Sequence, residues 1–66
     1  MESVKINATK EQLASVGIDY EITGLTGYVN HKFPSGYWCV KVKHVWEGLE
    51  FENEFDIPNF WLELKK

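Results

Sequence analysis

The chain has one cysteine, two prolines and no long apolar run among its 66 residues. With only Cys39 available, an internal disulfide and a zinc site built from several cysteines are both excluded. The longest uninterrupted apolar stretches are too short to predict a membrane span. The N-terminus also lacks the basic and then apolar pattern of a signal peptide, so we expect a cytoplasmic protein.

Positive charge is scarce as well, because seven basic residues are set against ten acids, for a formal net charge of −3. Nucleic-acid-binding domains usually carry a basic stripe, so this balance argues against such a role without excluding it. A chain of this length buries only roughly 60% of its unfolded surface. We therefore expect one small domain, residues 1–66, with a thin core. Its three tryptophans, three tyrosines and four phenylalanines are more than such a core is expected to bury.

The N-terminal part carries the one helical pattern in the sequence. Residues 9–12, Thr-Lys-Glu-Gln, fit a capping box, in which the threonine and glutamine side chains bind backbone amides of the first turn. Leu13 and Val16 then fall on one helix face, and Gly17 suits the left-handed position after a helix end. We predict a short capping helix over residues 9–17 that packs against a sheet.

From Ile18 onward, apolar residues recur at every second position, which is typical of strands. Gly24-Leu-Thr-Gly27, Pro34-Ser-Gly36 and Glu47-Gly48 have the composition of turns, and Pro58 ends the strand before it. The predicted strands are residues 18–23, 28–33, 37–46, 49–58 and 62–64, with a single turn at 59–61.

A two-residue turn at Glu47-Gly48 predicts the register of the hairpin around it, since each pair is then equidistant from the turn. One side of this hairpin is apolar, with Val40 opposite Phe55, and the other is charged. The expected charged pairs are Lys41–Glu54 and Lys43–Glu52. A loop at Ser35-Gly36 likewise predicts the register of the preceding hairpin. Its expected pairs are Phe33–Trp38, Val29–Val42, Asn30–Lys41 and Tyr28–Lys43.

Acids occupy positions 50, 52, 54 and 56, alternating with mostly apolar residues. We interpret this row as the solvent-facing side of a strand, where each Lys–Glu pair contributes roughly 0.2–1 kcal/mol. Side chains two apart in a strand lie about 6.8 Å apart, whereas a DNA strand carries one charge per about 3.4 Å. An anionic docking surface or DNA mimic is therefore the less favoured interpretation.

Three segments resemble the Src-homology-3 family and related small barrels. Ile57-Pro-Asn-Phe-Trp-Leu-Glu-Leu64 is similar to the terminal signature of an aliphatic residue, proline, a one-turn helix closing on an aromatic, and a last strand. Gly36-Tyr-Trp-Cys-Val-Lys-Val42 is similar to the glycine, paired aromatics and strand of that family. Gly24-Leu-Thr-Gly-Tyr-Val29 resembles the Gly-x-x-Gly-x-Val turn of bacterial and ribosomal small barrels. The resemblance implies a mainly β fold over residues 18–65: a five-stranded Src-homology-3-like barrel, with a short N-terminal helix and a one-turn helix before the last strand.

In peptide-binding members of that family, the groove is formed by positions that match Tyr37, Pro58 and Trp61. Together with the aromatic surplus, this resemblance leads us to expect a non-catalytic protein-binding module, or a small regulatory or inhibitory subunit, that acts through an exposed aromatic rim. The predicted rim consists of Tyr37, Trp46, Pro58, Phe60 and Trp61.

Two other functions stay open. A nucleic-acid-binding small barrel would use a strip of aromatic and basic side chains, namely Tyr28, Lys32, Lys41 and Lys43. An acidic inhibitor encoded by a phage or mobile element, or a DNA mimic, ranks below it. We expect no enzyme, cofactor or metal site, because His31 and His44 fall on the side opposite Cys39 in the predicted register.

Overall fold

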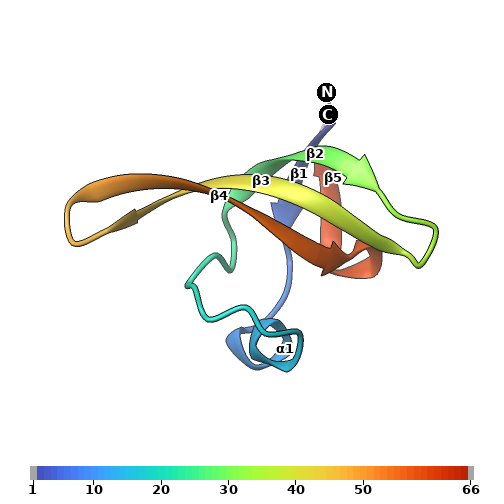
Figure 1. Cartoon of the computed structure of the whole chain (residues 1–66), viewed down its shortest axis with the longest axis horizontal. Helices are drawn as coiled ribbons and strands as arrows, with labels where there is room; N and C mark the ends of the chain where they lie inside the picture. The colour runs from blue at the N-terminus through green and yellow to red at the C-terminus, as the bar shows by residue number, and fades with distance from the viewer. Residues whose placement is uncertain (1, 66) are drawn as a thin grey trace.

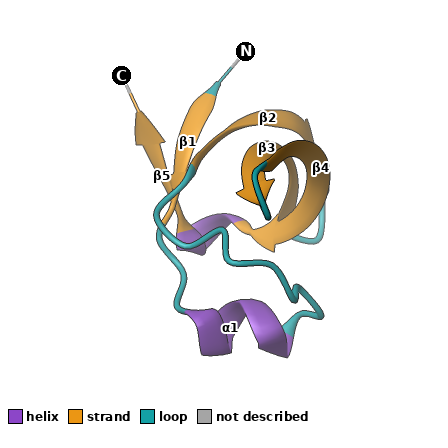
Figure 2. Ribbon diagram, turned by 90° about the vertical axis from the view of Figure 1, so that its left-hand side faces the viewer, coloured by secondary structure: helices purple, strands orange, loops and turns teal. Residues whose placement is uncertain are grey.

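The computed structural model describes residues 2–65, which form one five-stranded antiparallel sheet and one short α-helix (Figure 1). In chain order the elements are β1 (Ser3–Ile6), α1 (Lys10–Ser15), β2 (Thr26–Lys32), β3 (Tyr37–Trp46), β4 (Leu49–Pro58), the 3-10 helix η1 (Asn59–Trp61) and β5 (Leu62–Lys65). The strand order across the sheet is β4-β3-β2-β1-β5. The predicted mainly β fold with a short helix and a last turn is confirmed. The sheet is curled and open, because β4 and β5 are unpaired edges within the described residues (Figure 2).

The first strand is β1, and the prediction of a strand at residues 18–23 is wrong. Val4 and Ile6 of β1 are fully buried, and β1 pairs with both β2 and β5. Residues 18–23 instead belong to a loop whose Ile18 and Ile22 side chains are also buried. The loop satisfies backbone groups through turns, since the Ile22 amide donates to the carbonyl of Tyr20. Alternating apolar residues therefore anchor a loop here without forming a strand.

The predicted capping box is confirmed at the start of α1. The Gln12 amide donates to the Thr9 hydroxyl at 3.1 Å, and the Thr9 amide donates to the Gln12 side-chain oxygen at 2.8 Å. The helix ends at Ser15, so it is shorter than the predicted 9–17. Its Leu13 side chain is buried in the core, which places α1 against the open side of the curled sheet (Figures 1 and 2).

The predicted register of the β3–β4 hairpin is confirmed along its whole length. Lys41 lies opposite Glu54, and the apolar pairs follow on the other side. The two turn residues have positive φ, 51° at Glu47 and 78° at Gly48, as a type I′ turn requires. A shift of one residue would move the acids of β4 to the core side, so both the turn and the burial pattern select this register.

The predicted register between β2 and β3 is wrong, for a local reason. The Phe33 amide donates to the Tyr37 carbonyl, so the connection has three loop residues, with Gly36 at φ 96°, instead of the two at Ser35-Gly36. A bulge between Val29 and His31 then shifts the pairing again. The observed pairs are Gly27–Val42, Tyr28–Lys41, Val29–Val40, His31–Cys39 and Lys32–Trp38.

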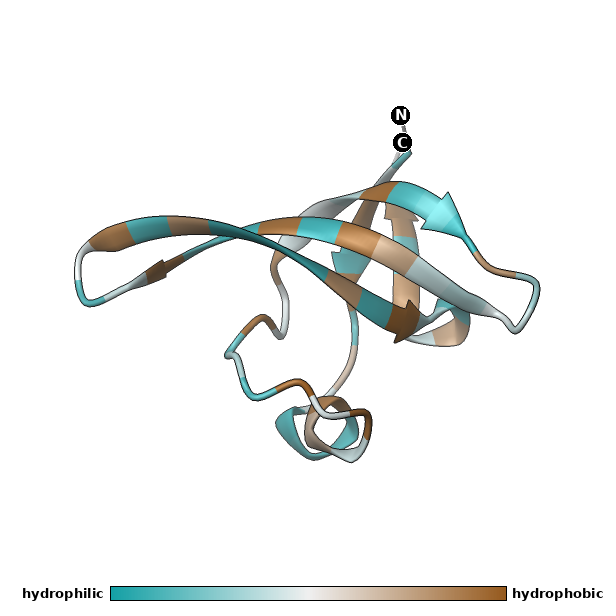
Figure 3. Cartoon of the chain, viewed as in Figure 1, coloured by the Kyte–Doolittle hydropathy of each residue, from teal (hydrophilic) through white to brown (hydrophobic). Residues whose placement is uncertain are grey.

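The core lies between the inner face of the curled sheet, α1 and the loop after it (Figure 3). Its buried apolar side chains are Val4, Ile6, Ala8, Leu13, Ile18, Ile22, Val40, Val42, Phe55 and Ile57. None of the ten aromatic residues except Phe55 belongs to this buried set. The core is therefore aliphatic, and most of the aromatic surplus lies at or near the surface.

Gly27 is the position where the core leaves no space for a side chain. A Cβ atom there would lie 2.6 Å from Cγ1 of Val40 and 2.8 Å from the backbone oxygen of Lys41. We expect Gly27→Ala to lower the free energy of unfolding by about 1–3 kcal/mol, measured by urea denaturation. Thr23→Ala, at an exposed position just before β2, should change it by less than about 0.5 kcal/mol. A Gly27→Ala protein as stable as the wild type would contradict this close approach.

Candidate functional site

The β3–β4 hairpin extends beyond the rest of the sheet. Both of its strands have ten residues, whereas β2 lies beside β3 only as far as Val42. Beyond Val42 the hairpin has no further strand on either side within the described part of the chain. Figure 1 shows it projecting from the body of the molecule toward the turn at Glu47-Gly48. We call this projecting part, residues 43–52, the arm.

One side of the arm carries large apolar side chains that remain exposed within residues 2–65. Trp46, Leu49 and Phe51 continue the inner face of the sheet and are 61%, 63% and 41% exposed. Tyr20, from the loop after α1, lies beside them with its ring 5.0 Å from that of His44. We call these five residues the arm face. Tyr20, His44, Trp46 and Phe51 line an open groove of about 710 Å³, and Leu49 lies opposite Trp46 in the hairpin.

His44 marks the boundary between the core and the arm face. Its side chain is 8% exposed, and its Nε2 lies 2.7 Å from the side-chain oxygen of Asn53, which satisfies this buried polar group. Its ring stacks on Phe51 at 5.9 Å with an interplanar angle of 25° and also contacts Tyr20. The histidine therefore holds two of the exposed rings in position, and the arm face is preorganised.

Two acidic side chains border the arm face. Asp19 and Glu21, on either side of Tyr20, line the groove, and Lys10 is the basic residue that lines it with them. On the arm, Glu47 is an exposed acid in the turn, and the exposed Lys43, Glu50 and Glu52 lie on the side of the hairpin opposite the arm face. An apolar surface with an acidic border is suited to a partner that offers apolar side chains together with positive charge.

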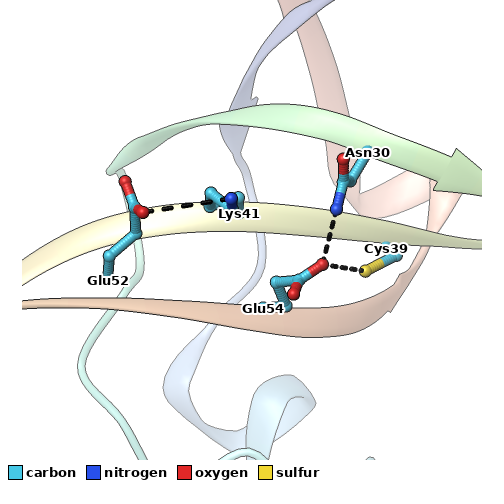
Figure 4. Close-up of polar contacts among 5 residues, drawn as sticks. All are labelled: Asn30, Cys39, Lys41, Glu52 and Glu54. Carbon is cyan, nitrogen blue, oxygen red and sulfur yellow. Dashed lines mark hydrogen bonds and ion pairs between the residues drawn. The ribbon is translucent and has the colours of Figure 1, made fainter.

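The opposite side of the hairpin carries a polar network (Figure 4). The Glu54 carboxylate accepts hydrogen bonds from the Asn30 amide at 2.6 Å and from the Cys39 thiol at 3.3 Å. The Asn30 hydrogen bond is the main reason why the pKa of Glu54 is lowered. Lys41 lies opposite Glu54 as predicted, but its ion pair is diagonal, to Glu52 at 3.9 Å. The Glu54 carboxylate is thus held by two hydrogen bonds within the chain, whereas Glu52 has one long ion pair, to Lys41.

Cys39 lies beside His31, because the β2 bulge turns that histidine away from the core side. The prediction that both histidines lie opposite the cysteine is therefore wrong for His31. Burial, followed by the hydrogen bond to Glu54, raises the pKa of Cys39 to about 11. The thiol is protonated at neutral pH, so it is a poor nucleophile. Among residues 2–65, no group of three or more His, Cys, Asp or Glu side chains could hold a metal ion.

The structure divides the predicted aromatic rim between the two ends of the hairpin. Tyr37 and the buried Pro58 lie opposite each other where β4 ends, and η1 follows with Phe60 and Trp61 in ring contact at 5.7 Å. Phe60 is 76% exposed, whereas Trp61 packs partly against the core. Trp46 lies at the other end of β3, nine residues and roughly 30 Å away. It belongs to the arm face.

The predicted nucleic-acid strip is also divided. Tyr28 lies directly opposite Lys41, with Lys43 next to it on the same side of β3. Lys32 lies on the other side because of the bulge, with its Nζ 4.2 Å from the centre of the Trp38 ring and an ion pair to Glu2. Three residues of the strip therefore share a side, next to the acids of β4.

Sequence reasoning missed Tyr20, His44, Leu49 and Phe51 as members of the site. The signal was present in the strand lengths, because the predicted strand at 28–33 is too short to cover a ten-residue neighbour. Apolar side chains that continue to alternate up to the turn at Glu47-Gly48 then lie beyond the end of that neighbouring strand and are exposed.

A comparison with protein-family models, with curated proteins and with solved structures finds no match to this chain. The longest helix in the described residues, α1, has six residues, so no helix there is able to cross a membrane. The function is therefore inferred from the geometry and chemistry of the surface.

The link between Glu54 and Cys39 can be measured in solution. Glu54→Gln removes the carboxylate that accepts from the thiol, so the pKa of Cys39 should fall from about 11 toward its ordinary value of 9.0. The measurement is the pH dependence of the rate of alkylation by iodoacetamide. Because the folded pKa of Cys39 is raised, its contribution to stability is complete below pH 9.0 and is lost as the pH rises through about 11.

Glu52→Gln is the matched control, since Glu52 precedes Glu54 in the same acidic row and has Lys41 as its ion-pair partner. It should leave the alkylation profile unchanged. An unchanged profile in Glu54→Gln would show that the carboxylate does not hold the thiol proton.

Proposed function

We propose that this chain is a non-catalytic protein-binding domain of the small Src-homology-3-like type, which holds its partner against the arm face. The observation that carries this function is the gathering of the exposed side chains Trp46, Leu49 and Phe51 on one side of the arm. The family assignment is supported by the end of the chain, where η1 and β5 follow Pro58 in the order that the resemblance implies.

The energetics of burial favour a protein partner. Covering one large apolar side chain contributes roughly 1.5–3 kcal/mol, and rigid aromatic rings lose little conformational freedom on binding. Protein interfaces are enriched in such side chains at their centre, with a polar border around them. The arm face has this composition, with Trp46 and Phe51 inside and Asp19 and Glu21 at the border.

The same surface is less suited to the other functions considered. Phosphate groups would be repelled by the acids of β4, which adjoin the strip of Tyr28, Lys41 and Lys43. Catalysis would need an activated group in an enclosed site, whereas the pKa of Cys39 is raised and the groove beside the arm is open. A regulatory or inhibitory subunit would act through the same protein-binding face.

The proposal is tested by removing the two aromatic rings of the arm face. The double variant Trp46→Ala with Phe51→Ala should retain the fold, since both side chains are exposed. Quantitative affinity capture in the cells that normally produce the chain should show at least a tenfold loss of partner, as expected when two central interface residues are truncated.

Phe60→Ala is the matched control, because this ring is also exposed but lies at the opposite end of the hairpin. Capture by this variant should equal that of the wild type. Equal capture by the double variant would overturn the proposal, and loss with Phe60→Ala alone would move the binding surface to η1.

A further inference from the structure

The β4 strand is a long edge of the sheet with an unpaired side. It has ten residues, and within residues 2–65 it pairs with β3 alone. Edge strands present a row of free backbone donors and acceptors to which another strand can add. Near Asp56 the strand approaches Ser15 and Val16, which line a common groove with it. Residues 49–54 are the part of this edge nearest the turn at Glu47-Gly48.

The hairpin turn determines which backbone groups face outward. In a two-residue type I′ hairpin, the residues flanking the turn, Trp46 and Leu49, exchange both hydrogen bonds, and every second pair after them does the same. The pairs that include Phe51 and Asn53 thus direct their amides and carbonyls toward β3. The amides and carbonyls of Glu50, Glu52 and Glu54 point to the open edge, so each free backbone site belongs to an acid.

Acidic and apolar side chains along this edge lie on opposite sides of the strand. Glu50, Glu52 and Glu54 lie on the outer side, whereas Leu49 and Phe51 lie on the arm face. On the occupied side of β4, strand β3 places Lys43 opposite Glu52, Lys41 opposite Glu54 and Trp46 opposite Leu49. The unoccupied side offers the same acids and the same apolar residues to a second such strand.

We infer that residues 49–54 of β4 bind an extended basic segment of a partner protein, which adds to the sheet as an antiparallel strand. Its lysine or arginine side chains lie opposite Glu50, Glu52 and Glu54, and its alternate apolar side chains extend the arm face. This inference rests on the proposed function and names the class of partner. Charge complementarity favours a basic segment, because Glu50 lies opposite Val45 and has no lysine directly across from it.

A second copy of this chain is a poor occupant of the same edge. Antiparallel pairing of two β4 edges brings outward-facing residues opposite one another, so the acids of one copy would face the acids of the other. Like charges directly opposite each other destabilise a strand pair. Sedimentation of the chain alone should therefore show a monomer, and a dimer that dissociates when Glu50 and Glu52 are changed to lysine would overturn the inference.

The direct test uses a synthetic peptide with capped ends, Val-Lys-Val-Lys-Val-Lys-Val, labelled for fluorescence anisotropy at low salt. Lysines opposite the acids occupy the positions whose amides donate to β4. N-methylation of the three lysine amides should weaken binding at least tenfold. N-methylation of three valine amides, which face away from β4, should leave the Kd within about twofold. Equal effects of the two modifications would overturn strand addition.

The acids are tested by Glu50→Gln with Glu52→Gln, which should weaken peptide binding about fivefold, as expected for the loss of two cross-strand charge pairs. Glu63→Gln, an exposed acid on the other edge strand, is the matched control and should bind as the wild type does. If no peptide binds while partner capture still depends on Trp46 and Phe51, strand addition is wrong and the proposed function stands.

Discussion

The structure depends on the type I′ turn at Glu47-Gly48 and on the ten-residue pairing that it begins. Because side chains alternate across a strand, this one turn decides which residues of β3 and β4 enter the core. Val40 and Phe55 are buried as a result, and Lys41 and Glu54 lie on the polar side. The core, the polar network and the arm face all follow from that register.

The β3–β4 hairpin could be predicted because two independent signals agree, the turn residues and the apolar alternation. The β2–β3 register could not, because a three-residue loop and a bulge at Asn30 replace the turn that composition favours. Alternation alone also fails to separate strands from loops. Ile18 and Ile22 alternate as well as Val4 and Ile6 do, yet only the latter pair belongs to a strand.

The candidate site could be predicted only in part, for a related reason. Trp46 could be predicted as an exposed ring because the chain has more aromatic residues than its small core is expected to bury. The arm face depends on a difference in length between neighbouring strands, which the predicted strands already contain and which the structure shows as β2 reaching no farther than Val42. Tyr20 joins the face through the loop after α1, and no local pattern of residues 18–23 indicates that position.

The acidic row and the exposed apolar face are best understood together. A long edge strand with exposed Leu49 and Phe51 would favour aggregation if it were neutral, since free backbone groups and apolar side chains both attract a second copy. Acids at every outward-facing position oppose that pairing. Full neutralisation by lysines within the chain would remove the protection, and the observed pattern is partial: Glu52 has a weak ion pair at 3.9 Å, while Glu50 faces Val45. The uncompensated negative charge that keeps copies apart is therefore the charge that a basic partner would neutralise.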